Sequence, residues 1–99
     1  MSTKTMSQVS MSRFGAILTG RDFGQKAMRE LEAEIEYPVV LDFSDTMSLG
    51  SSFGDETVVV LAKKQGGKIS VINPNAAVGA CLQKLGQDHG IAIEISHKT

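Results

Sequence analysis

The chain has 99 residues, 41% hydrophobic and 21% charged, which is enough for one hydrophobic core and too few for two domains. The formal net charge of −1 and the scattered basic residues argue against binding to nucleic acid or to an anionic membrane, because phosphate recognition needs clustered cations. A single cysteine excludes an intrachain disulfide and a multi-cysteine metal site. No apolar run is long enough for a membrane span or a signal peptide, so we expect a cytoplasmic protein.

The N-terminal part of the sequence has two regions of different character. Residues 1–8 carry several hydroxyl side chains and no apolar periodicity, so we expect a flexible tail followed by a single domain over residues 9–97. From Val9 to Leu18 the pattern favours one strand, or a short hairpin broken near Gly15.

An amphipathic helix is predicted over residues 21–36, because apolar residues recur there every four positions. The residues at this spacing are Phe23, Ala27, Leu31 and Ile35. Thr19 is a suitable N-cap, and Pro38 disfavours helical geometry in the residue before it. The glutamates between these apolar positions are expected on a solvated face.

The rest of the chain is organised around residues 39–61, which combine a buried strand, a polar loop and an apolar helix. The run Val39–Phe43 predicts a central strand with at least one covered face. A hydroxyl of Ser51 or Ser52 is placed to cap the helix, and Asp55 follows Ser52 by three residues, as in a capping box.

The C-terminal third predicts one further helix between two strands. The pair Gly66-Gly67 should end the preceding helix, and residues 69–72 read as a strand. Asn75 is expected to cap a third helix, which ends at the glycine at position 86 or 90. Residues 91–95 alternate between apolar and other side chains, which indicates an edge strand with one wet face.

The order β-α-β-α-β-α-β predicts an α/β fold with a mainly parallel sheet of four to five strands, three main helices and right-handed crossovers. In open sheets of this kind, ligands bind beyond the carboxyl ends of the strands. That rule points to the loop over residues 44–52.

Carboxylates around this loop leave a second hypothesis open. Asp42, Asp45, Asp55 and Glu56 offer oxygen ligands for Mg²⁺ in a small-ligand or metal-dependent enzyme. Asp42 and Asp45 are three residues apart, however, and phosphoryl-transfer signatures place their aspartates two apart so that both project to one side. We favour capping and solvation roles for Asp55 and Glu56, and expect no cofactor and no metal.

The remaining reactive side chains favour structural roles. Cys81 has helical spacing with Val78 and Leu82, which predicts burial of the thiol. His89 and His97 have no sequence neighbour at metal-ligand spacing and are expected at the surface.

Two segments carry a family resemblance. Leu41-Asp42-Phe43 and the run from Ser51 to Glu56, followed by an apolar helix, a Gly-Gly pair and a helix after Asn-Pro, resemble the STAS-like domains of unknown function of the DUF4325 type. The resemblance covers residues 14–95 and implies a STAS-like fold. Arg21, at the start of the first predicted helix, matches a basic residue that these domains carry at that position. The chain is more distantly similar to the STAS domains of anti-sigma factor antagonists, in which a partner kinase phosphorylates a loop serine.

The resemblance implies a non-enzymatic regulatory module controlled by serine phosphorylation. The phosphosite would be Ser51, with Ser52 beside it, although Gly50 stands where the antagonists have aspartate and Phe53 where they have glycine. Helix capping by the same serines remains the competing interpretation. The implied partner-binding residues are Arg21, Ser44, Asp45, Thr46, Ser48, Ser51, Ser52, Asp55 and Glu56. The expected partner is a histidine-kinase-like ATPase or an anti-sigma-type regulator, and the chain itself is expected to be a monomer or a homodimer paired through residues 91–95.

Overall fold

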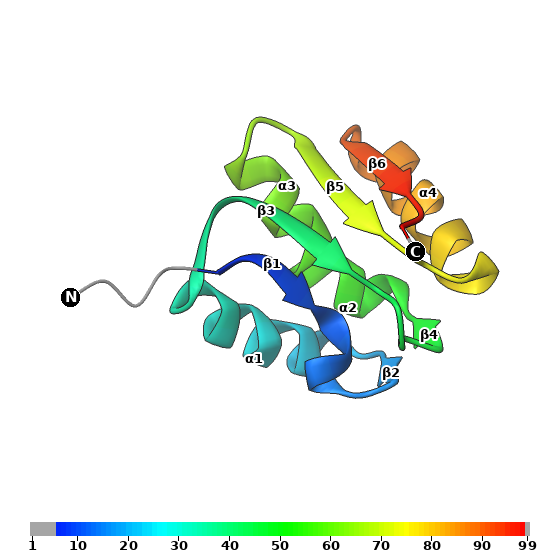
Figure 1. Ribbon diagram of the computed structural model, residues 1–99, viewed down its shortest axis with the longest axis horizontal. Helices are drawn as coiled ribbons and strands as arrows, with labels where there is room; N and C mark the ends of the chain where they lie inside the picture. The colour runs from blue at the N-terminus through cyan, green and yellow to red at the C-terminus, as the bar shows by residue number, and fades with distance from the viewer. Residues whose placement is uncertain (1–5, 99) are drawn as a thin grey trace.

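The computed structural model, which describes residues 6–98, has an α/β fold built on four parallel strands (Figure 1). These strands are β1 (Met6–Ser10), β3 (Ile35–Asp42), β5 (Lys68–Ile72) and β6 (Ala92–Ser96), and they lie side by side in that order. Each crossover therefore moves the chain one place in the same direction. Because such crossovers are right-handed, every connecting helix is delivered to the same face of the sheet.

Four helices cover that face (Figure 1). They are α1 (Arg21–Glu32), α2 (Ser51–Glu56), α3 (Val58–Lys64) and α4 (Ala76–His89). The predicted fold class, a parallel sheet with three main helical connections, is confirmed. Among the four strands of the described chain the order never reverses, so they form no switch point of the kind that opens a ligand crevice in doubly wound folds.

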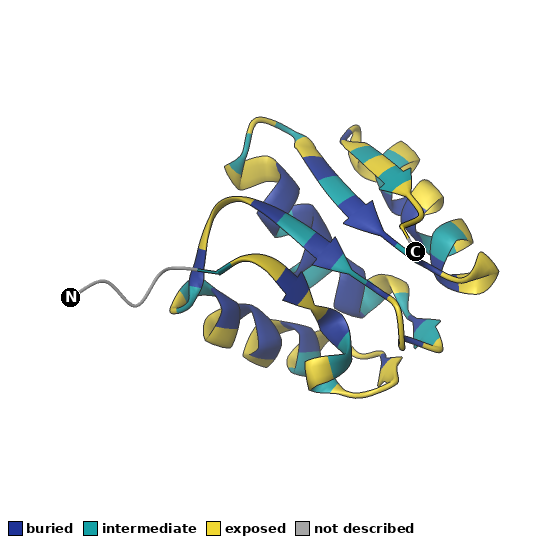
Figure 2. Ribbon diagram, viewed as in Figure 1, coloured by how far each residue is buried: buried dark blue, intermediate teal, exposed yellow. Residues whose placement is uncertain are grey.

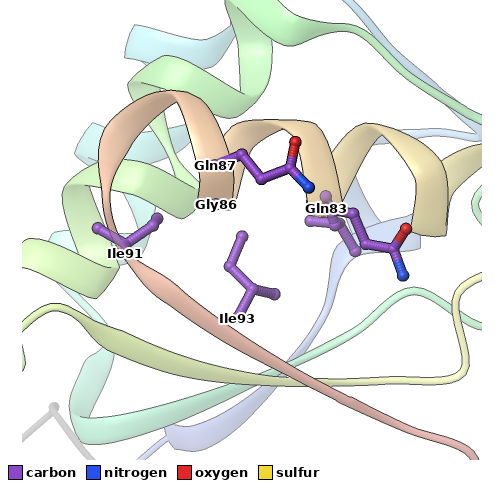
Figure 3. A pocket seen from close by; sticks show the side chains of 6 residues that line it. Gln83, Gly86, Gln87, Ile91 and Ile93 are labelled. Carbon is purple, nitrogen blue, oxygen red and sulfur yellow. The ribbon is translucent and has the colours of Figure 1, made fainter.

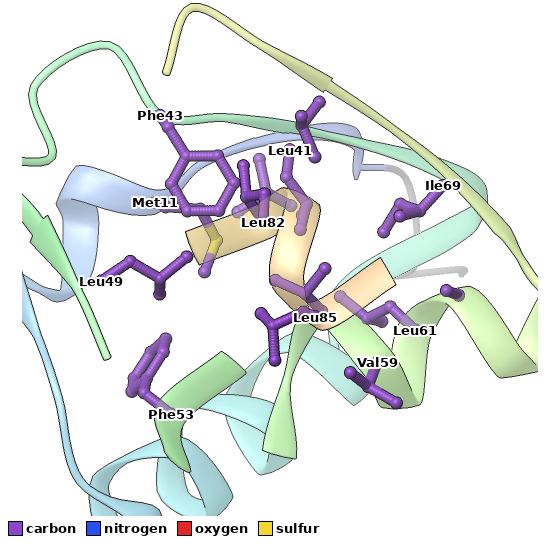
Figure 4. Close-up of a cluster of buried hydrophobic side chains, with 14 of the residues drawn as sticks. Met11, Leu41, Phe43, Leu49, Phe53, Val59, Leu61, Ile69, Leu82 and Leu85 are labelled. Carbon is purple, nitrogen blue, oxygen red and sulfur yellow. The ribbon is translucent and has the colours of Figure 1, made fainter. Parts of the chain in front are cut away.

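The sheet has one buried and one open face, as the alternating burial along the strands shows (Figure 2). Paired residues on the helical side form apolar rows, such as Val9, Leu41, Val71 and Ile95. These rows pack on aliphatic and aromatic side chains from the helices, including Phe53, Leu61, Leu82 and Leu85 (Figure 4). The corresponding rows on the open side are largely polar, for example Gln8, Val40, Ser70 and Glu94.

The N-terminal prediction was wrong in two places. Residues 6–8, expected in the tail, belong to β1, because pairing with β3 gives their backbone hydrogen-bond partners; residues 1–5 of that tail lie outside the described residues. The next segment is not a hairpin. A short 3-10 helix, η1 (Met11–Phe14), leads to β2 (Ile17–Leu18), which pairs in parallel with the distant β4 (Ser48–Leu49).

The first helix is shorter than the apolar period predicts. It ends at Glu32, and Ile35 and Glu36 open β3 instead. Ile35 pairs with Met6 of β1 and is 2% exposed. Its side chain is therefore buried in the core, as predicted, but it belongs to a strand and not to the helix. The helix begins after Gly20, with no side-chain cap, so the expected cap at Thr19 is absent.

The helix expected after the central loop is divided in two at Thr57. This residue is fully buried, and its hydroxyl donates to the Phe53 carbonyl oxygen at 2.9 Å. The Thr57 backbone leaves helical geometry, with φ −122° and ψ −73°, which separates α2 from α3.

Predictions for the C-terminal third are confirmed. Gly66 and Gly67 follow α3 with positive φ values of 81° and 85°. The Asn75 side chain caps α4 by accepting a hydrogen bond from the Val78 amide at 2.7 Å, and Gly90 ends this helix in the left-handed conformation. β6 is an edge strand. Within residues 6–98 no helix is long and apolar enough to cross a bilayer.

Candidate functional site

The loop between β3 and α2 lies beyond the carboxyl end of the sheet and is fixed by backbone pairing. The amides of Met47 and Ser48 both donate to the Ala16 carbonyl oxygen, at 2.8 and 3.2 Å. The Gly50 amide donates to the Leu18 carbonyl oxygen at 2.8 Å. This small two-stranded sheet of β2 and β4 holds the loop against the segment that precedes α1.

Two asparagines from the turn before α4 hold the other side of the loop. The Asn75 Nδ2 group donates to the carbonyl oxygens of Thr46 and Met47, at 3.2 and 3.1 Å, while the Asn75 Oδ1 atom caps α4. The Asn73 Nδ2 group donates to the Ser44 hydroxyl at 3.2 Å. Neither asparagine was expected at the site, because the contacts join residues that are 28 or 29 positions apart in sequence.

The serines at the start of α2 do not cap the helix. The N-cap residue is Gly50, no side chain caps the helix, and Ser51 is already its first residue. Gly50 itself is packed closely, since a Cβ atom there would lie 3.1 Å from the Thr19 Cγ2 atom. The capping interpretation of Ser51 and Ser52, and the capping box with Asp55, are therefore wrong. Ser51 is exposed and Ser52 is half-buried.

Charged side chains from three helices meet beside these serines. The Arg21 guanidinium, in the first turn of α1, lies 2.6 Å from the Glu56 carboxylate and 3.3 Å from the Asp55 carboxylate. The second Asp55 oxygen lies 2.9 Å from His89 Nε2 on α4. Hydrogen bonds to Glu56 and then to Asp55 raise the pKa of Arg21.

The close approach of α1 and α2 makes this charge cluster possible. Gly24 of α1 is buried, and a Cβ atom there would lie 3.0 Å from Glu56 Cβ and 3.1 Å from the Phe53 carbonyl oxygen. The rings of Phe23 and Phe53 pack edge-to-face at the same contact, with centroids 5.2 Å apart. Arg21, one turn away, therefore reaches the carboxylates of α2.

The four carboxylates of the enzyme hypothesis are not brought together. Asp42 accepts hydrogen bonds from the Ser44 amide and hydroxyl at 2.9 and 2.6 Å, and Asp45 is exposed at the same end of β3. Asp55 and Glu56 instead face Arg21. Among residues 6–98 no group of three histidine, cysteine or acidic side chains is placed to hold a metal ion.

The expected partner-binding residues differ in their solvent exposure. Thr46 is only 4% exposed, and its hydroxyl has no hydrogen-bond partner among the described residues. It is therefore part of the support of the loop and does not lie on its surface. Arg21, Ser44, Asp45 and Ser51 are exposed, and the remaining members of the set are partly buried, namely Ser48, Ser52, Asp55 and Glu56.

Two exposed apolar residues border the loop, and neither was predicted from the sequence as part of the site. Ile17 is 59% exposed and Met47 is 66% exposed, and in the described chain Tyr37, at 38%, is the third large hydrophobic residue of this kind. Ile17 pairs with Ser48 in the small sheet, next to Met47. The sequence feature that could have indicated this exposed apolar pair was Met47, a methionine inside a polar loop.

The two histidines lie at the surface as predicted, whereas the predicted burial of the Cys81 thiol is only partial. Cys81 is half-buried, and burial raises the pKa of its thiol, with a further contribution from the negative charge of Asp55. His89 and His97 are exposed. His97 Nε2 lies 3.2 Å from the Pro74 carbonyl oxygen.

The described chain is therefore an α/β domain with its helices on one face of a parallel sheet and a tethered loop between β3 and α2. The family model described as the STAS-like domain of unknown function (DUF4325) matches residues 24–78, more than half of the chain, and the protein belongs to this family. The matched region runs from α1 to the first turn of α4, so it contains the loop and both serines but neither Arg21 nor His89. No curated protein and no solved structure matches the chain.

Proposed function

We propose that this protein is a non-enzymatic regulatory module of the cytoplasm that binds a protein partner through the loop between β3 and α2. The observation that carries the proposal is the pair of exposed apolar side chains, Ile17 and Met47, set among exposed hydroxyl groups. We call Ile17, Ser44, Asp45, Met47 and Ser51 the recognition surface. Apolar anchors within a polar rim are typical of protein interfaces.

The rigidity of the loop supports this role. Backbone pairing with β2 and side-chain hydrogen bonds from Asn73 and Asn75 hold the loop from both sides. A surface fixed before binding loses little conformational entropy on association, so even a small patch contributes effectively to affinity.

A phosphorylation switch at Ser51 is the second part of the proposal. The partner is a histidine-kinase-like ATPase that transfers the γ-phosphoryl group of ATP to the Ser51 Oγ atom: the new oxygen–phosphorus bond replaces the bond to ADP, and the hydroxyl proton passes to a base of the kinase. Ser51 is the better acceptor because it is exposed and Ser52 is half-buried. Phosphate adds close to two negative charges beside the apolar anchors, which disfavours rebinding of the partner.

Arg21 reduces the electrostatic repulsion that a phosphate on Ser51 would meet. Asp55 and Glu56 lie one turn beyond Ser51 and would repel it, but both carboxylates face the Arg21 guanidinium. The cation offsets part of the local negative charge.

The switch is tested by incubating the full chain with ATP and a candidate histidine-kinase-like ATPase. We expect the mass increase of one phosphoryl group, mapped to Ser51, and loss of that increase in Ser51→Ala but not in Ser52→Ala. An unmodified chain, or modification confined to other residues, contradicts the switch. A complex that forms without ATP and without modification leaves partner binding standing and removes only the switch.

A further inference from the structure

The free edge of β6 is a second interaction surface, formed by other residues than the recognition surface. The Ala92 amide donates to the Gly67 carbonyl oxygen and the Ser96 carbonyl accepts from the Asn73 amide, both at 2.8 Å, so these residues of β6 bond toward β5. Successive residues of a strand point their backbone groups to opposite sides. Ile93 and Ile95 therefore present their amides and carbonyls outward, to an edge that no other strand occupies in the described chain.

This edge carries one exposed charge, Glu94 on the open face, and has no irregularity or proline between Ala92 and Ser96. Its register with β5 is regular from Ala92 to Ser96, whereas β1 at the opposite edge has an irregularity between Met6 and Gln8. Bulges, prolines and charges at outward positions block edge-to-edge association. Ile93 and Ile95 supply none of these.

Open space lies beneath the edge, between β6 and α4. One hollow of 510 Å³ is lined by Gln83, Gly86 and Gln87 of α4 together with Ile91 and Ile93 (Figure 3). A second hollow, of 420 Å³, lies on the other side of Gln83 and reaches Ile95 and His97. An added strand would extend its alternate side chains over these hollows, as in peptide recognition by strand addition.

The sequence of the edge identifies the occupant. Ile91-Ala92-Ile93-Glu94-Ile95 is symmetric in its apolar positions about Ile93. We propose that the occupant is a second copy of this chain, paired antiparallel through β6 with Ile93 opposite Ile93, to form a continuous eight-stranded sheet. The row on the helical side then contains only isoleucines, and on the open side Ala92 lies opposite Glu94 of the second copy.

Charge complementarity supports this register. Lys68 of β5 is directly opposite Ala92, and its ammonium group lies 3.7 Å from the Glu94 carboxylate of its own chain. Glu94 of the second copy falls in the same row as Lys68, two strands or roughly 10 Å away across a small alanine, so the two carboxylates share this lysine. Lysine and glutamate side chains together span that separation. The neighbouring register, with Ile93 opposite Ile95, would instead place Glu94 directly against Glu94, which is unfavourable.

Light scattering during gel filtration over a concentration series tests the dimer. We expect the mass of two chains for the full-length protein. Ala92→Glu places two symmetric pairs of like charges across the interface and should weaken dimerisation by roughly fivefold or more, whereas Ala92→Lys faces Glu94 and should tighten it. Ala92 is exposed, so both variants keep the fold, and Gln8→Glu at the opposite edge is the matched control. A monomer at all concentrations, or equal dimerisation of the two Ala92 variants, overturns the proposal.

Cross-linking tests the register. In a Cys81→Ser background, a mixture of Ala92→Cys and Glu94→Cys chains should form a disulfide between the two kinds of chain, since opposed residues of a non-hydrogen-bonded pair have Cα atoms about 4.5 Å apart. Neither variant alone should cross-link efficiently. A covalent dimer of Glu94→Cys alone would show the shifted register and contradict pairing at Ile93.

Discussion

Arg21 in the first turn of α1 forms ion pairs with two consecutive carboxylates of α2, at 2.6 Å to Glu56 and 3.3 Å to Asp55. All three side chains are partly exposed, and such pairs contribute little to stability. These ion pairs instead reduce the negative charge near Ser51, because Ser51 is the first residue of the helix that carries both acids.

Arg21→Gln should therefore separate stability from modification. We expect a small decrease in melting temperature and a clearly slower phosphorylation of Ser51, since the two carboxylates are left without their cation. Lys26→Gln removes a charge from an exposed site on the same helix and is the control. Equal phosphorylation rates for the two variants would count against a role of Arg21 in the switch.

Gly24→Ala should destabilise the protein, because the added methyl group meets the backbone of Phe53 and the Cβ of Glu56 at 3.0–3.2 Å. Crowding of this kind costs about 1–3 kcal/mol of unfolding free energy, measurable by urea denaturation. Gly79→Ala is the matched control, since its nearest neighbour is the Pro74 Cγ atom at 4.0 Å. That variant should gain about 0.5–1 kcal/mol from helix propensity, and a loss comparable to that of Gly24→Ala would refute the packing argument.

Two substitutions at Asn75 should separate helix capping from loop support. Asn75→Asp keeps the acceptor for the Val78 amide but replaces the donor to Thr46 and Met47 with an anion. Hydrogen exchange should then accelerate in the loop while the first turn of α4 stays protected. Asn75→Ala should release both segments and cost about 1 kcal/mol for the lost cap. Unchanged loop exchange in both variants would show that Asn75 does not support the loop.

The Cys81 thiol should titrate above its ordinary pKa in the folded protein, first because it is partly buried and second because Asp55 is nearby. A raised folded-state pKa means that the thiol contributes its stability below the ordinary thiol pKa and loses it as pH rises through the folded value. Ultraviolet absorbance of the thiolate, in native buffer and in urea, measures the difference. Asp55→Asn should lower the native midpoint, and a native midpoint at or below the unfolded one contradicts this assignment.

Local patterns were sufficient for much of the fold. The apolar run around Val39 and Leu41 predicted the central strand, and Asn75 predicted the start of α4. The same kind of evidence failed at Ile35, where the four-residue spacing fits a helix but the side chain reaches the core from β3. Pairing with Met6 places Ile35 in a strand and not in the helix. The two residues are 29 positions apart, so this contact cannot be predicted from local hydrophobic periodicity.

The sequence predicted only part of the geometry around the loop between β3 and α2. Arg21 was named as a cation that offsets Asp55 and Glu56, and the structure pairs these groups, yet capping by Ser51 failed because Gly50 occupies the N-cap position. The support from Asn73, Asn75 and Ala16, and the exposure of Met47, depend on segments that meet only in the folded chain. A hydroxyl next to a helix start does not by itself show whether it caps the helix or faces solvent.

Partner binding through the recognition surface is tested most directly by the affinity of a candidate partner, a histidine-kinase-like ATPase, for three chains: the natural protein, Ile17→Ser combined with Met47→Ser, and Tyr37→Ser. All should fold alike, because the three substituted side chains are exposed at 59%, 66% and 38%. We predict that the double variant loses at least tenfold in affinity, the equivalent of about 1.4 kcal/mol, while Tyr37→Ser binds like the natural protein. Equal binding of all three chains, or loss confined to Tyr37→Ser, would contradict the account.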